Sequence, residues 1–204
     1  MKFVKWKILI ITAVICLLPV FLGLSLWENL PDTMAIHFDI NNNPDNFASK
    51  GFVVFGLPVL MALMQTFCCI VTDLNAQKHG SRKKFEAAAK WIIPVMFVFL
   101  QTITLGYGLG HDIDIRKCAV TIVSVIFIVL GNYMPKLDYV KNYNIDTQKA
   151  RKINRFMGFS MVIMGILFLI TIFFPPIFSV IALILLIPYI LLTVIYSIAV
   201  IRKK

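Results

Sequence analysis

Six long apolar runs constrain this chain more than any other feature of its sequence. We expect membrane spans at 7–26, 52–72, 91–109, 118–134, 156–174 and 177–201. Crossing a hydrocarbon core of ~30 Å takes about 20 mainly apolar residues, and each run is close to this length. Each run must form a helix, because hydrocarbon offers no partner to unpaired backbone groups. The sequence therefore predicts an all-α fold, a polytopic membrane bundle of six transmembrane helices.

The composition excludes an ordinary soluble domain. Hydrophobic residues make up 59% of the chain and charged residues 15%, with a mean hydropathy of +0.85. Soluble domains carry roughly 25% charged residues. The excess apolar surface needs a lipid bilayer as its solvent.

The basic residues predict the orientation of the spans. The net charge is +10, and only Lys50, Arg116 and Lys117 fall in the segments that an N-inside chain places outside. The other seventeen Lys and Arg residues then fall inside, which is a strong positive-inside pattern. We expect both termini in the cytoplasm and the basic charge beside anionic lipid headgroups rather than on nucleic acid.

The chain divides by position into three regions, at 1–72, 73–117 and 118–204. The first inner loop predicts a turn at His79-Gly80-Ser81 and then a basic helix from Arg82 into the third span. In the second inner loop, Asp146 or Thr147 is a candidate N-cap for a basic helix that continues into the fifth span.

The predicted spans have no Lys, Arg, Asp, Glu or His in their interiors. Ion-coupled transporters usually depend on such groups. Gln65 and Gln101 predict hydrogen bonds between helices or, as an alternative, a polar path for a small transporter. Gly106 and Gly110 predict close packing on a neighbouring helix. We expect kinks or local openings at the prolines within spans, which are 19, 58, 94 and 188.

No catalytic signature is recognised, and we expect no enzyme activity and no cofactor. The residue pairs His37 with Asp39 and His111 with Asp112 lie in two predicted outer segments. Folded together, these side chains offer the ligand types of a divalent metal. An intramembrane metal-dependent hydrolase is therefore an alternative, although the spacing is not specific and no metal site is assigned.

The outer segment between the first two spans is the most informative stretch. Pro31 ends the first helix, residues 35–40 alternate as a short extended piece, and Asn43-Pro44-Asp45 predicts a turn. We expect Ile36 and Phe47 to anchor the segment at the bilayer surface and Lys50 to snorkel at the second span. The segment forms either a structural cap or a recognition surface.

Two motifs carry a resemblance to a known family. The first is Leu30-Pro31-x-x-x-Ala35-Ile36-His37-Phe38, followed by Pro44-Asp45-x-Phe47-x-Ser49-Lys50. The second is Gly131-Asn132-Tyr133-Met134-Pro135-Lys136, followed by Ala150-Arg151-Lys152-Ile153-Asn154-Arg155-Phe156-Met157-Gly158. In order, spacing and number of spans the chain resembles the SdpI family of bacterial membrane proteins.

The resemblance implies an immunity protein of the bacterial plasma membrane. Such a protein protects the producing cell from a secreted toxic peptide, and signalling to a cytoplasmic transcriptional repressor is a further implication. The implied candidates for toxin recognition are His37, Phe38, Asp39, Pro44, Asp45, Phe47 and Lys50. The implied candidates for binding the cytoplasmic partner are Arg151, Lys152 and Arg155, and the structural motif residues are Asn132, Tyr133 and Pro135.

Overall fold

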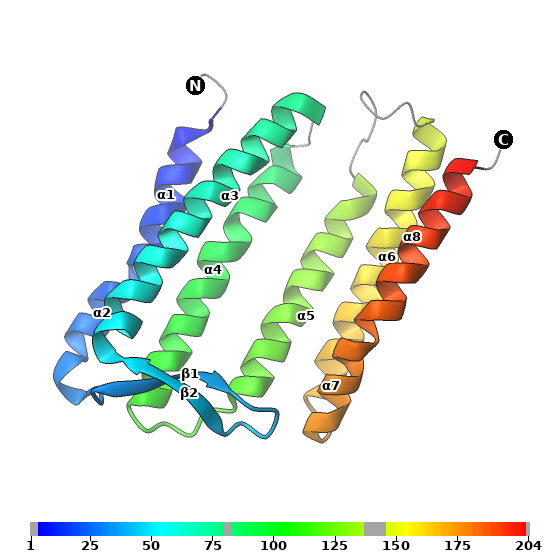
Figure 1. The fold of residues 1–204 in the computed structure, drawn as a ribbon. Helices are drawn as coiled ribbons and strands as arrows, with labels where there is room; N and C mark the ends of the chain where they lie inside the picture. Colours follow the sequence, from blue (N-terminus) through cyan, green and yellow to red (C-terminus); the bar gives the residue numbers. More distant parts are fainter. Residues whose placement is uncertain (1–3, 80–82, 137–145, 203–204) are drawn as a thin grey trace. The chain divides into compact units, whose positions relative to one another are not determined.

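The computed structural model describes residues 4–79, 83–136 and 146–202 (Figure 1). The helices are α1 (Trp6–Leu17), α2 (Pro19–Ser25), α3 (Leu57–His79), α4 (Lys83–Gly108), α5 (Ile115–Tyr133), α6 (Thr147–Thr171), α7 (Pro176–Ile184) and α8 (Leu186–Arg202). Short 3-10 turns cover Trp27–Asn29 and Met134–Lys136, and a π-helical turn covers Phe52–Gly56.

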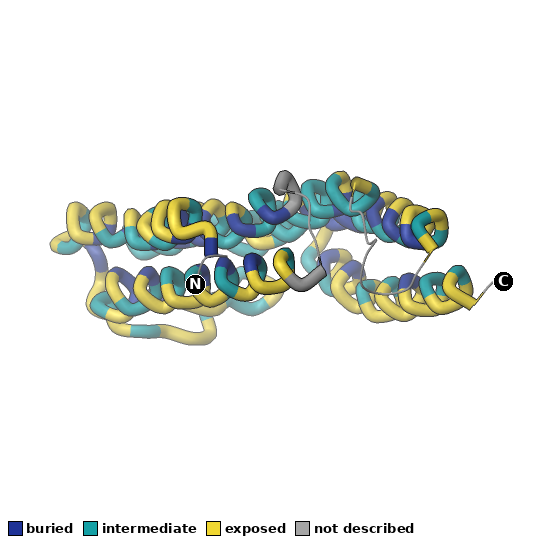
Figure 2. The backbone as a smooth tube through the Cα atoms, turned by 90° about the horizontal axis from the view of Figure 1, so that it is seen from above, coloured by how far each residue is buried: buried dark blue, intermediate teal, exposed yellow. Residues whose placement is uncertain are grey.

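Six helical stretches of the described chain are long and apolar enough to cross a membrane. They run over Trp6–Ser25, Phe52–Gln77, Glu86–Gly108, Ile115–Lys136, Thr147–Thr171 and Pro176–Arg202. The prediction of a polytopic helical membrane protein is therefore confirmed, while its orientation stays a prediction. Figure 2 shows the exposed positions that run along the helices, as lipid-facing surfaces require.

The helices extend beyond several predicted spans, because polar residues continue them. The basic helix expected to enter the third span is present and begins at Lys83. Asp146 is the N-cap of α6, and its side chain accepts a hydrogen bond from the Gln148 backbone N–H at 3.1 Å. The predicted turn at His79-Gly80-Ser81 lies largely outside the described residues.

The prolines act differently from one span to the next. Pro19 separates α1 from α2, Pro58 follows the π-helical turn, and the break between α7 and α8 precedes Pro188. These positions agree with the expected local openings, because a proline removes a hydrogen bond from the preceding turn. Pro94 instead lies inside the uninterrupted helix α4.

The chain forms two compact units. Unit 1 comprises Met1–Leu74 and Ala89–Ala119, and unit 2 comprises Asn75–Ala88 and Val120–Lys204. The core of unit 1 includes Met34, Val53, Val54 and Leu105. The core of unit 2 is built around Met164, Phe168 and Ala182.

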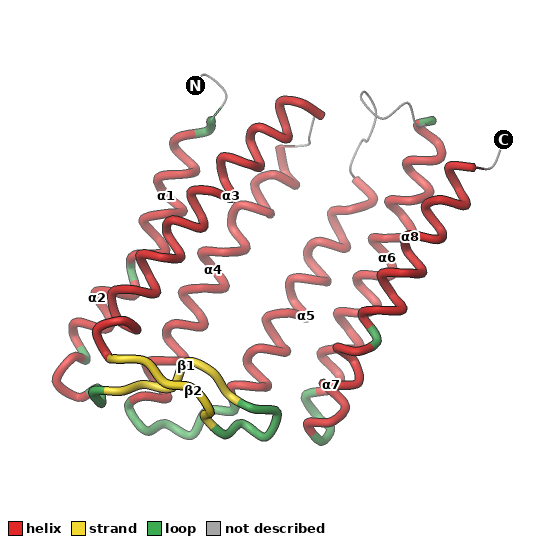
Figure 3. The backbone as a smooth tube through the Cα atoms, in the orientation of Figure 1, coloured by secondary structure: helices red, strands yellow, loops and turns green. Residues whose placement is uncertain are grey.

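In unit 1, a two-stranded antiparallel sheet follows α2 (Figure 3). Strand β1 (Thr33–Phe38) pairs with β2 (Pro44–Ser49), so the segment is a β-hairpin. The predicted turn at Asn43-Pro44-Asp45 is wrong, because Phe38 pairs with Pro44 and the chain reverses over residues 39–43. Pro44 is tolerated as the first residue of an edge strand.

Candidate functional site

The hairpin turn is built by the side chain of Asp39. Its carboxylate accepts hydrogen bonds from the backbone N–H groups of Asn41 and Asn43, both at 2.8 Å. These bonds, with a third from the Asn43 side chain at 3.1 Å, stabilise the charged form, and the pKa of Asp39 is lowered mainly by its bonds from Asn43. Asn42 takes a left-handed conformation with φ 68°, which asparagine tolerates better than most residues.

Asn42 also joins the hairpin to the loop between α4 and α5. Its side-chain amide donates to the Ile113 carbonyl at 3.1 Å and accepts from the Ile115 N–H at 2.8 Å. Both halves of one amide group are thus satisfied by a segment more than 70 positions away in sequence. The first and second predicted outer segments therefore form one assembly.

Two further contacts seat the hairpin on the end of α4. The ring of Phe38 meets that of Tyr107 edge to face, with ring centroids 4.8 Å apart. Met34 is 1% exposed and occupies the space beside Gly108, where an added Cβ would lie 2.6 Å from the Met34 Cε. A Cβ at this position would displace the end of the Met34 side chain, so Gly108 leaves room for the buried face of β1.

Within the chain, Gly106 and Gly110 do not pack on a neighbouring helix as predicted, while packing between monomers stays a prediction. A Cβ on Gly106 would meet the Ile113 side chain at 3.1 Å, so Gly106 packs against the following loop. Gly110 lies in that loop with φ +87°, the left-handed region that favours glycine. The small residues allow a tight turn rather than close approach of two helices.

The Lys50 side chain is held by contacts within the protein and is not free on the surface. Its ammonium group donates to the carbonyls of Trp27 and Leu30 at 3.3 and 3.2 Å, and lies 3.4 Å from the Asp32 carboxylate. The same group lies 4.8 Å from the centre of the Trp27 ring. Lys50 therefore satisfies the carbonyls left open where the first span ends.

The candidates for toxin recognition are of two kinds: residues that hold the hairpin in place and residues that are exposed. Phe38, Asp39 and Lys50 hold the hairpin together, and Pro44 opens β2. We define the exposed hairpin face as the three remaining candidates, His37, Asp45 and Phe47, together with Ile36, which is also exposed. Within this face, His37 Nδ1 and Asp45 Oδ1 lie 2.5 Å apart and Phe47 is 54% exposed.

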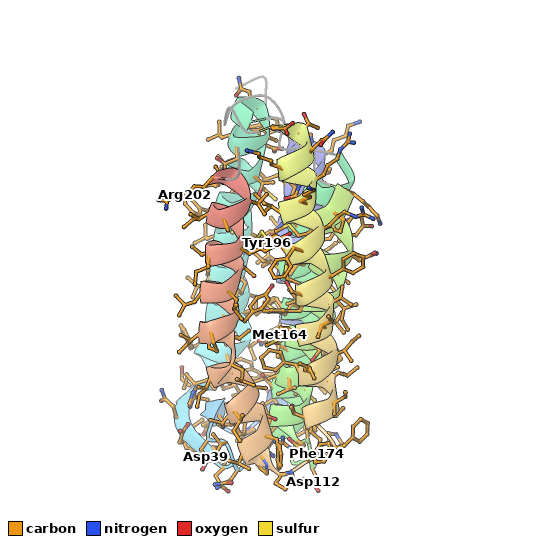
Figure 4. The ribbon with its side chains drawn as sticks, turned by 90° about the vertical axis from the view of Figure 1, so that its right-hand side faces the viewer. Asp39, Asp112, Met164, Phe174, Tyr196 and Arg202 are labelled. Carbon is orange, nitrogen blue, oxygen red and sulfur yellow. The ribbon has the colours of Figure 1, made fainter. Side chains whose placement is uncertain are left out.

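The four residues of the metal alternative do not converge. His37 is engaged with Asp45, and Asp39 with the hairpin turn. Figure 4 marks Asp39 and Asp112 near the hairpin end of unit 1. In the part of the chain that the structure describes, no group of three or more His, Cys, Asp and Glu residues is placed to hold a metal ion.

A buried ion pair, which the sequence did not predict, links α3 and α4. Lys90 Nζ donates to Asp73 Oδ1 at 2.6 Å, and each side chain is 1% exposed. The second carboxylate oxygen accepts the Lys5 backbone N–H at 2.9 Å. Both residues lie one position outside the predicted spans 52–72 and 91–109, in helices that run past those spans.

The intramembrane glutamines bond between helices. Gln65 donates to the Thr12 hydroxyl and to the Lys90 carbonyl, each at 2.8 Å, joining α1, α3 and α4. Gln101 donates to the Val53 carbonyl at 2.7 Å. Both are at most 2% exposed, so the interhelical hydrogen bonds expected as one alternative are present.

In unit 2, the two halves of the second motif pack against each other. A Cβ on Gly158 would lie 2.5 Å from Pro135 Cδ and 2.6 Å from the Gly131 carbonyl oxygen. Lys136 Nζ lies 5.2 Å from the centre of the Tyr133 ring. Asn132 is exposed, and so are Gln148, Arg151, Lys152 and Arg155 in the first turns of α6.

In a comparison with protein families, residues 14–62 match a domain of unknown function (DUF1648). This stretch is roughly a quarter of the 204 residues and includes α2, the hairpin and the start of α3. No curated protein and no solved structure matches the chain significantly. The chain is thus a multi-pass helical membrane protein whose hairpin and flanking helices match the DUF1648 model.

Proposed function

We propose that this chain is an immunity protein of the bacterial plasma membrane, which protects the producing cell from a secreted toxic peptide. The observation that carries the proposal is the seated hairpin with its exposed face of Ile36, His37, Asp45 and Phe47. All four residues belong to the motif that resembles the SdpI family. Apolar side chains beside a carboxylate suit an amphipathic, cationic peptide.

The predicted outer side also favours such a peptide through its charge. Its acidic residues outnumber its three basic ones, and Lys50 and Arg116 both lie close to carboxylates. A cationic peptide approaching the bilayer is therefore attracted to the hairpin end of the protein. Under the signalling part of the proposal, Arg151, Lys152 and Arg155 bind the cytoplasmic repressor.

Neither alternative is favoured by a specific observation. The hydrolase requires His37, Asp39, His111 and Asp112 to converge, and the first two have other partners. The transporter requires a polar path, and Gln65 and Gln101 are occupied by bonds between helices.

The test is expression in a strain sensitive to any peptide toxin that is found encoded beside the gene of this chain. Wild type should raise the toxin concentration that stops growth, and the pair Asp45→Asn with Phe47→Ala should abolish most of that gain. Phe67→Ala is the matched control, because Phe67 is 67% exposed on α3 and away from the hairpin. Absence of protection by the wild type, at normal membrane abundance, contradicts immunity; equal loss in the control contradicts the assigned surface.

A further inference from the structure

The start of α6 has two opposite faces. Ala150, Asn154 and Gly158 are buried at a spacing of four residues. Arg151 and Arg155 repeat at the same spacing on the exposed side, with Lys152 beside them. Residues four apart lie above one another on a helix, so the two arginines form one column.

That exposed column continues as an apolar surface. Phe159 and Ile163, the next two positions at the same spacing, are 63% and 58% exposed. Exposed aromatic and aliphatic side chains on a membrane-spanning helix face lipid tails. Arg151 and Arg155 therefore stand above lipid-facing residues, on the side of the helix where lipid molecules pack.

The depth of the arginines matches the headgroup layer. The apolar part of α6, residues 156–171, rises about 24 Å at ~1.5 Å per residue, against a hydrocarbon core of ~30 Å. Arg155 is thus at the edge of the hydrocarbon, and Arg151 lies ~6 Å further out. The headgroup layer is itself about 5–8 Å thick on each side.

Other basic groups gather at the same end of unit 2. Lys149 Nζ donates to the Ile201 carbonyl at 3.1 Å and so ties the end of α8 to the start of α6. Arg202, exposed in the last turn of α8, is thereby brought to this end, away from Phe174 (Figure 4). The local field is strongly positive where a lipid phosphate would lie.

We propose that Arg151, Lys152 and Arg155 bind the phosphate of an anionic phospholipid. Guanidinium groups bind phosphate oxygens in pairs, which a lysine ammonium does not. A soluble protein is a poorer fit, because it would have to reach below the headgroups to contact Arg155. This inference does not depend on the immunity part of the proposed function or on the orientation of the chain. It is an alternative to the signalling part, which assigns the same three residues to a cytoplasmic repressor.

The experiment measures lipid selectivity of the full chain in nanodiscs by spin resonance. Spin-labelled phosphatidylglycerol and phosphatidylcholine give the relative association constant of the anionic lipid. For Arg151→Gln/Lys152→Gln/Arg155→Gln we expect this constant to fall at least about fivefold, the contribution of one basic residue near an anionic surface. Arg151→Lys/Arg155→Lys, which keeps the charge, should fall by less and serves if the triple variant does not fold.

The matched control, Arg82→Gln/Lys83→Gln/Lys84→Gln, removes the same charge from the other basic run. It should retain most of the selectivity. An equal fall of the association constant in the control would show that the effect depends on net charge alone and would overturn the proposal. Unchanged selectivity in the folded triple variant would also overturn the proposal and would favour a protein partner at this surface.

Discussion

Gly158 and Gly131 meet backbone to backbone in unit 2, since a Cβ on Gly158 would lie 2.6 Å from the Gly131 carbonyl oxygen. These glycines belong to the two halves of the second motif, which are separated in sequence and joined in space. Because the two backbones are this close, a side chain at Gly158 would clash with the Gly131 carbonyl group.

Gly158→Ala should destabilise the protein by about 1–3 kcal/mol, the usual cost of overpacking a close contact. The measurement is the thermal midpoint of the purified protein in detergent. Gly51→Ala is the control, because a Cβ there meets nothing within 4 Å and the backbone is helical. Equal midpoints for the two variants would contradict the tight packing.

We expect substitutions of Asp73 and Lys90 to have non-additive effects on the free energy of unfolding. Asp73→Asn or Lys90→Met alone leaves one buried polar or charged group without its partner and should cost about 3–5 kcal/mol. The double variant Asp73→Asn/Lys90→Met should recover much of this loss, because it removes both charges and keeps an oxygen to accept the Lys5 backbone N–H. A double-mutant cycle in detergent unfolding checks the coupling, and simple additivity would mean that the pair is not stabilising in solution.

Asn42→Ala should loosen the start of α5 without unfolding the protein. The Ile115 N–H donates to the Asn42 side chain, so its hydrogen exchange should accelerate in the variant. Asn41→Ala keeps the backbone N–H that bonds Asp39 and is the control. Unchanged exchange at Ile115 in Asn42→Ala would show that the bridge is not maintained in solution.

The lowered pKa of Asp39 predicts loss of hairpin stability in acid. A carboxyl whose folded-state pKa lies below its ordinary value of 3.8 stabilises the fold above that value. This stabilisation is lost as the pH falls from about 3.8 through the lowered folded-state pKa. Hairpin amide exchange measured against pH should show the loss, and Asp39→Asn should remove this dependence.

The spans were predictable because each needs only a local apolar run. The N-cap Asp146 was predictable for the same reason, since capping depends on residues within one turn. The second strand was not, because Pro44-Asp45-Asn46 has low strand propensity and pairs with β1, which is itself held on α4 by Met34 and Phe38. A long-range contact decided the local structure.

The ion pair was missed for a related reason. A hydropathy window ends a span at the first charged residue, and Asp73 and Lys90 lie directly beyond two such ends. Their opposite signs on both sides of one loop were the available signal. Only the three-dimensional structure shows that each neutralises the other.

The bridge made by Asn42 can form only after its partners have been synthesised. Its partners follow it by 71 and 73 positions, which takes about 4–15 s to translate at ~5–20 residues per second. During that interval the hairpin has been made and its seat has not. The domain matched at residues 14–62 is therefore completed only by residues translated after it, and a fragment that stops near residue 62 lacks both partners of the Asn42 side chain.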